Sequence, residues 1–152
     1  MTSKRWGRHM ERALEEAAAA GERGEVPVGA VVVGADGAVL SAAGNRIREL
    51  ADPTAHAEIL AIRQASKALG SERLTGCDLY VTLEPCAMCA GAISLARVRR
   101  LYFGASDPKG GGVEHGARVF AQPTCNHAPE VYGGFDEERC GALLKEFFAG
   151  RR

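Results

Sequence analysis

The sequence predicts an α/β fold in which a mixed sheet of about five strands is flanked by helices. Two observations carry this prediction. Segments of strand type and helix type alternate between residues 28 and 104, and the turn sequence Gly34-Ala35-Asp36-Gly37 joins two of the strand segments. The alternation indicates crossover connections that bring neighbouring strands parallel, whereas the short turn indicates an antiparallel hairpin. A sheet that contains both kinds of connection is mixed.

The N-terminal half is expected to contain a helix, a hairpin and a second helix. Apolar residues recur at helical spacing over residues 4–20, and a glycine that could end the helix follows them. Residues 28–33 form an apolar, β-branched run of the buried-strand type, and residues 38–44 should return antiparallel to it. The second helix is expected to begin near Thr54 and to end at Gly70.

The C-terminal half is expected to contain three strands and two helices. Residues 78–83 are apolar and β-branched, as in a buried strand. A helix should follow over residues 85–95, because proline suits the first turn of a helix. Residues 98–104 and 130–132 are the fourth and fifth strands, and residues 137–149 are the last helix.

The composition is typical of a globular protein. The chain of 152 residues is 46% hydrophobic and 25% charged and has no internal repeats, so we expect one domain over residues 1–152. It has no run of eighteen apolar residues and no apolar signal core, so we expect no membrane partner and reduced cysteines in the cytoplasm. Nineteen basic and nineteen acidic side chains balance. This argues against a large, sequence-indifferent nucleic-acid binder, but not against a protein that reads one RNA loop.

One group of residues has the chemistry of a metal centre. Cys86 and Cys89 follow Pro85, three residues apart, so both sulfurs should lie on one face of the first helical turn. The positive end of the helix dipole favours thiolate there. With His56 they provide three zinc ligands and leave the fourth tetrahedral position open, as in catalytic zinc sites. Glu58, two residues after His56, is placed to move protons rather than to bind metal.

Each of these motifs has other interpretations when taken alone. A C-x-x-C pair can be a redox pair, half of a structural zinc site or two core cysteines, and H-x-E is often two polar residues near a helix start. The combination of H-x-E with P-C-x-x-C about thirty residues later is far more specific, and it is the signature of zinc nucleobase deaminases. In such a site zinc lowers the pKa of its bound water, and the target base must be received flipped out of its stack.

Further motifs extend this similarity. They are Glu25-Val26-Pro27-Val28-Gly29-Ala30, Asn45-Arg46, Asp52-Pro53-Thr54-Ala55-His56-Ala57-Glu58, Leu79-Tyr80-Val81-Thr82-Leu83-Glu84-Pro85-Cys86 and Asn126-His127. With them the chain resembles, over nearly its whole length, the bacterial tRNA-specific adenosine deaminase family of the cytidine/deoxycytidylate deaminase superfamily. The resemblance implies a three-layer α/β/α, cytidine-deaminase-like fold. It also implies a homodimer with one zinc per chain that binds a tRNA anticodon stem-loop and converts the wobble adenosine of an arginine tRNA to inosine.

The resemblance also implies substrate contacts. Asn45 would lie in the substrate pocket, where its amide can pair with a purine edge or a ribose hydroxyl. The full set of substrate-binding candidates is Val28, Asn45, Ala57, Glu84, Asp107 and Lys109. Ser106 departs from the family, in which arginine is common, and this puts the strength of RNA binding in doubt rather than the chemistry. The consecutive glycines 110–112 are expected to make a mobile loop.

Three functions stay open on the sequence. The first is a tRNA adenosine deaminase, and the second is a free guanine or cytidine deaminase with the same zinc residues but a different pocket and different loops. The third is a non-enzymatic, zinc-stabilised RNA-binding module, which the open three-ligand site disfavours. The matches at Val26-Pro27-Val28, Asn45 and the Asp107–Lys109 pair favour the first over the second. Phe148 and Arg151-Arg152 are either further RNA contacts or a solubilising tail.

Overall fold

The computed structural model describes residues 2–150, and it describes side chains from Gly7 onward, so Arg151 and Arg152 lie outside the described residues. The elements in chain order are α1 (Thr2–Glu22), β1 (Gly29–Val33), β2 (Val39–Gly44), α2 (Ala57–Leu69), β3 (Asp78–Leu83), α3 (Ala87–Ala96), β4 (Arg100–Ala105), the 3₁₀ turn η1 (Val119–Ala121), β5 (Glu130–Tyr132) and α4 (Glu137–Ala149). Every predicted helix and strand is confirmed, with ends that shift by up to three residues. Among the described residues, no helix is long and apolar enough to cross a membrane.

The sheet is mixed and five-stranded, as predicted, with the order β2-β1-β3-β4-β5. β1 runs antiparallel to both β2 and β3, whereas β3, β4 and β5 are parallel. The expectation that each crossover joins neighbouring strands is therefore only half correct. The connection through α3 joins the neighbouring strands β3 and β4. The connection through α2 joins β2 to β3; these two strands run in the same direction, but the antiparallel strand β1 lies between them.

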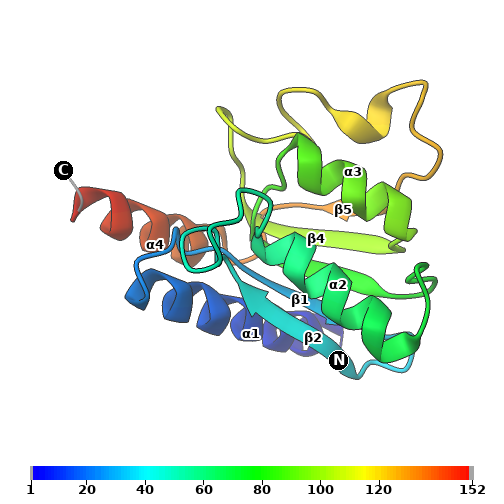
Figure 1. Cartoon of the computed structure of the whole chain (residues 1–152), viewed down its shortest axis with the longest axis horizontal. Coiled ribbons are helices and arrows are strands. Elements are labelled where there is room, and N and C mark those ends of the chain that lie inside the picture. The colour runs from blue at the N-terminus through cyan, green and yellow to red at the C-terminus, as the bar shows by residue number, and fades with distance from the viewer. Residues whose placement is uncertain (1, 151–152) are drawn as a thin grey trace.

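The fold has three layers, with α2 and α3 on one face of the sheet and α1 and α4 on the other (Figure 1). Side chains of β1 alternate between two cores. Ala30 and Val32 pack towards α2 and α3, while Val31 and Val33 pack towards α1 and α4. A sheet covered on both faces needs strands that are apolar throughout, which explains the continuous apolar runs in the sequence.

Three loops meet at one edge of the sheet. Because β2, β3 and β4 run in the same direction, their carboxyl ends lie together, and the segments 45–56, 84–86 and 106–118 follow them. The first two segments lead into the N-termini of α2 and α3 (Figure 1). This edge is the usual position of a ligand site in an open α/β sheet.

Candidate active site

The predicted metal ligands come together at the N-termini of α2 and α3. His56 occupies the N-cap of α2 and Cys86 the N-cap of α3, and neither side chain makes a capping hydrogen bond. Both side chains are thus left for another partner. Cys89 lies in the first turn of α3, while Pro85 stands just before the N-cap rather than inside the helix as expected. The three ligand atoms lie within 4.8 Å of one another.

The geometry of this group fits zinc. The Nδ1 atom of His56 lies 3.7 Å from the Cys86 Sγ and 3.5 Å from the Cys89 Sγ. A tetrahedral zinc ion with usual bond lengths of about 2.0–2.1 Å to nitrogen and 2.3 Å to sulfur gives nitrogen–sulfur edges of about 3.6 Å. One imidazole and two thiolates are a donor set typical of zinc, and three protein ligands leave a coordination position for a small molecule.

The two thiols differ in their affinity for a proton. The pKa of Cys86 is lowered to about 4, chiefly because the Cys89 thiol hydrogen-bonds to it and secondarily because His56 lies beside it. The pKa of Cys89 is raised by the same hydrogen bond and by burial. Cys86 is therefore the more readily ionised of the two thiols. A divalent cation, which needs thiolate ligands, would favour the ionised form of both.

Glu58 is the buried acid–base group of the site. It lies in the first turn of α2 and is only 4% exposed. Burial raises the pKa of its carboxyl to about 7, because desolvation disfavours the charged form. A cation held by the neighbouring ligands would favour the carboxylate and pull this pKa down again. The group is thus suited to exchange a proton near neutral pH.

Asn45, Val28 and Ala57 form a buried layer next to the ligands. The Asn45 side chain accepts a hydrogen bond from the Ala57 N–H at 2.7 Å and donates one to the Val26 carbonyl at 3.2 Å. It therefore ties the start of α2 to the segment before β1. Val28 and Ala57 are at most 5% exposed and belong to the core under α2 and α3.

The structure gives Glu84 a different role from the predicted substrate contact. Its carboxyl side chain is fully buried, and both oxygens accept hydrogen bonds from the loop of residues 106–115. Burial raises the pKa of Glu84, but these hydrogen bonds outweigh burial and hold the pKa below its usual value. The Glu84 side chain therefore holds the loop of residues 106–115 in place through hydrogen bonds and does not contact the substrate.

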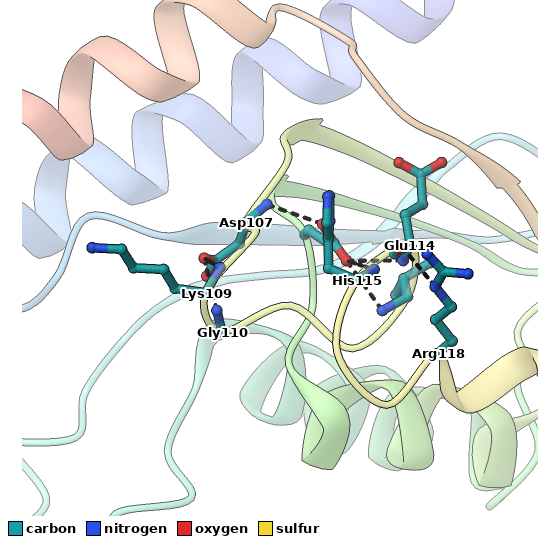
Figure 2. A network of polar contacts seen from close by, with 8 residues as sticks. Asp107, Lys109, Gly110, Glu114, His115 and Arg118 are labelled. Atoms are coloured by element: carbon teal, nitrogen blue, oxygen red, sulfur yellow. Dashed lines mark hydrogen bonds and ion pairs between the residues drawn. The ribbon is translucent and has the colours of Figure 1, made fainter.

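Asp107 and Lys109 lie on the loop that Glu84 holds. Asp107 Oδ1 accepts hydrogen bonds from the backbone N–H groups of Lys109 and Gly110, at 3.2 and 2.9 Å, and so closes a tight turn. The Lys109 side chain is exposed and extends away from this network (Figure 2). The expectation of a mobile loop is wrong for Gly111 and Gly112, which are buried.

Two residues that fix the loops were not recognised in the sequence. His115, which we rejected as a ligand of a second metal site because no spacing supports one, places its Nδ1 2.8 Å from the Glu84 Oε1. Glu25 is 2% exposed, and its carboxylate accepts hydrogen bonds from the backbone N–H groups of Arg48 and Glu49, at 3.2 and 2.8 Å. The one sequence feature that could have indicated this role is that Glu25 is an acidic residue close to a buried strand, and that feature is a weak signal.

Comparison with known proteins agrees with the fold and the site. The family model of the cytidine and deoxycytidylate deaminase zinc-binding region matches residues 3–105, which include all three predicted zinc ligands and Glu58. The fold, the ligand group and the buried glutamate therefore define a hydrolytic deaminase of this family.

The most similar individual proteins indicate which branch of the deaminase family the chain belongs to. The chain is 64% identical to a tRNA-specific adenosine deaminase of Agrobacterium fabrum, over 94% of this chain and 93% of that protein. A solved structure from work on A-to-I editing by tRNA:A34 deaminases at the wobble position superposes with a TM-score of 0.89 at 64% identity, covering 90% of this chain and 99% of the other. A guanine deaminase from Nitrosomonas europaea reaches a TM-score of 0.77 at 26% identity, covering 94% and 84%. The chain belongs to the tRNA-specific adenosine deaminase family.

Proposed function

We propose that this protein converts the wobble adenosine of an arginine tRNA anticodon to inosine in the cytoplasm and releases ammonia. One zinc ion per chain would be held by His56, Cys86 and Cys89. The observation that carries the proposal is the buried Glu58 carboxyl beside these three ligands. The tRNA substrate is supported by the 64% identity to a tRNA-specific adenosine deaminase, compared with 26% to a guanine deaminase.

The proposed chemistry divides between the metal and the chain. Zinc, when bound, supplies a Lewis acid that makes water a nucleophile at neutral pH. Glu58 takes the proton from the attacking water and delivers it to N1 of the adenine ring. The water oxygen bonds to C6 as N1 gains this proton. Glu58 then moves the remaining proton of that oxygen to the amine, and the C6–N6 bond breaks, so adenosine and water become inosine and ammonia. Burial raises the pKa of the Glu58 carboxyl and a bound cation would lower it again, so the group would start as the carboxylate that accepts the proton of the water.

The two helix N-termini assist this chemistry. The N-termini of α2 and α3 direct the positive ends of their helix dipoles to the site. These partial positive charges favour the thiolates and any negative charge that develops on the attacked base. They partly compensate for two thiolates, which lower the acidity of a zinc centre compared with a site of neutral ligands.

The substrate would be held by the remaining candidates. Val28 would form an apolar floor under a flipped-out base, and the fixed Asn45 amide would present its remaining hydrogen to it. Ala57 is fully buried, so it would support this floor rather than touch the base. Asp107 and Lys109 would meet the nucleotides next to the base. Recognition of a single-stranded loop with splayed bases is the usual way in which proteins read RNA sequence.

The decisive experiment compares substrates. A synthetic arginine-tRNA anticodon stem-loop with adenosine at the wobble position is incubated with the protein, digested to nucleosides and assayed for inosine. Free adenosine, cytidine and guanine are assayed in parallel, and a stem-loop with guanosine at the wobble position is the control. Only the adenosine stem-loop should react quickly, because flanking nucleotides provide the binding energy that positions the base. Rapid deamination of guanine without inosine formation would contradict the proposal and favour a guanine deaminase.

We also propose that the protein acts as a homodimer that uses the outer face of α3. Cys89, Ala90, Ile93 and Ala96 bury the inner face of this helix, yet Met88 and Leu95 on the outer face are 39% and 80% exposed. A helix that is apolar on all sides is expected to be covered on all sides.

The homodimer proposal is tested by sedimentation. The Leu95→Glu variant should shift the protein towards monomer. The Leu69→Glu variant changes another exposed leucine, at the end of α2, and should not alter the mass. A wild-type protein that sediments as a monomer would contradict the proposal.

A further inference from the structure

Glu84 is a fully buried carboxylate with five hydrogen-bond donors around it. Its Oε2 accepts from the backbone N–H groups of Val113, Glu114 and His115, at 3.2, 2.9 and 3.1 Å. Its Oε1 accepts from the Asp107 N–H at 2.9 Å and from His115 Nδ1 at 2.8 Å (Figure 2). A buried charge is tolerated only with such complete pairing, and charge-assisted hydrogen bonds are the strong ones.

The same loop is packed against the start of α3. The Gly112 N–H donates to the Pro85 carbonyl at 2.8 Å. A Cβ atom on Gly111 would lie 2.4 Å from the Glu84 Oε2, and one on Gly112 would lie 2.5 Å from the Ala87 backbone nitrogen. Any other residue would therefore have to shift its surroundings at both positions, so glycine is strongly favoured there.

These contacts connect the substrate candidates to the metal ligands. Glu84 lies at the end of β3, two residues before Cys86, and its Oε1 holds the first residue of the turn that carries Lys109. The position of that turn relative to the zinc ligands is therefore set by one short stretch of backbone and one carboxylate. Glu84 itself has no exposed side-chain surface and cannot touch a substrate.

We infer that Glu84 is a positioning residue, which fixes the loop of residues 106–115 so that Asp107 and Lys109 contact the RNA at a set distance from the zinc ligands. The inference rests on the proposed function. On this inference Glu84 contributes to the affinity for the RNA stem-loop, whereas Glu58 carries out the chemical step. Weakening the anchor should therefore raise KM for the stem-loop and leave kcat nearly unchanged.

The test uses Glu84→Gln with Glu114→Gln as the matched control. The glutamine amide keeps the shape but turns an NH₂ group towards backbone N–H donors, so it loses the bond to Asp107 in one orientation and the three bonds to Val113, Glu114 and His115 in the other. Glu114 lies on the same loop, but its side chain is exposed and points away from the network, and only its backbone N–H contacts Glu84 (Figure 2). Both variants undergo the same chemical change.

Glu84→Gln should raise KM for the stem-loop by about tenfold or more, the size expected when hydrogen bonds to a buried charge are lost. Its kcat should stay within about twofold of wild type, with zinc content unchanged, while Glu114→Gln behaves as wild type. If Glu84→Gln does not fold, Gly111→Ala provides the same readout, because its Cβ would push the loop from Glu84. An unchanged KM, or a loss of zinc with a matching loss of kcat, would overturn the inference.

Hydrogen exchange separates this inference from the proposed function. In the wild type the amides of Asp107, Val113, Glu114 and His115 should be protected together, and Glu84→Gln should release them together. This result needs no substrate, so it stands even if the wild type forms no inosine. Equal exchange of the four amides in both proteins would mean that Glu84 does not hold the loop.

Discussion

Gly112→Ala tests whether the loop of residues 106–115 is packed on the metal-binding helix. Gly112 does not have a positive φ, so alanine is allowed by the backbone and its effect is steric. The added Cβ would lie 2.5 and 2.7 Å from the Ala87 N and Cα atoms and 2.8 Å from the Cys86 carbonyl carbon. All three are backbone atoms, which cannot rotate away.

The size of the effect follows from these contacts. The loop and the start of α3 must separate by about 1 Å to restore ordinary van der Waals contact. Overpacking of this kind costs about 1–3 kcal/mol, and each kcal/mol lowers Tm by about 2–4 °C in a chain of this size. Because the displaced peptide carries Cys86, zinc should also be lost to a chelator more readily.

The assay is thermal unfolding with and without added zinc, together with zinc release to a colorimetric chelator. Gly141→Ala in α4 is the control, because a Cβ there would meet no atom within 4 Å outside its own helix backbone and chain neighbours. Its Tm should not fall, and it should rise slightly because alanine favours a helix more than glycine does. A Gly112→Ala protein with wild-type Tm and wild-type zinc retention would refute the reasoning, since the loop would then move aside at no cost.

Three further outcomes are expected. Glu58→Gln should lower kcat at least about a hundredfold, as for loss of a general acid–base group, with zinc content unchanged by metal analysis; retention of most activity would make Glu58 incidental. Cys89→Ala should lose zinc and lower Tm, because metal binding is coupled to folding, and full zinc occupancy would exclude Cys89 as a ligand. Since acidic and basic residues balance, the logarithm of RNA affinity should fall with that of salt at a slope of only about −2 to −4, given about 0.7 per phosphate; a much steeper slope would indicate an extended basic surface.

The sequence predicted the elements well because their signals are local. Apolar runs, helical spacing and the Gly34–Gly37 turn act within a few residues of each element. The order of strands is not local, and this is where the prediction was incomplete. Nothing in the spacing of β2, α2 and β3 indicates that β1 lies between the two strands.

The ligand group was predictable for a similar reason. His56, Cys86 and Cys89 each stand at or near a helix start, and chemistry of this kind depends on few residue types in a short pattern. Glu84 could not be assigned in the same way. Its partners are backbone N–H groups about thirty residues later in the chain. Nearly every residue type has such a group, so no residue type in the sequence indicates where these partners are.

The same limitation explains why the glycines were misread. Consecutive glycines permit flexibility, but they equally permit a backbone to approach another closely, and only the surroundings decide between the two. Here Gly111 meets a carboxylate and Gly112 meets a helix start. A sequence with three glycines therefore predicts an unusual loop without indicating whether it is loose or tightly packed.

The two anchored loops offer an explanation for how the proposed RNA binding could occur without a basic excess. Buried carboxylates hold the loops that follow β2 and β4, through Glu25 and Glu84 respectively. With no net positive charge, the protein cannot rely on many phosphate contacts for affinity. A loop that is already ordered pays less conformational entropy on binding, so each contact from Lys109 or its neighbours contributes more to affinity. On this argument, fixed loops would replace charge as the source of affinity for one short RNA segment.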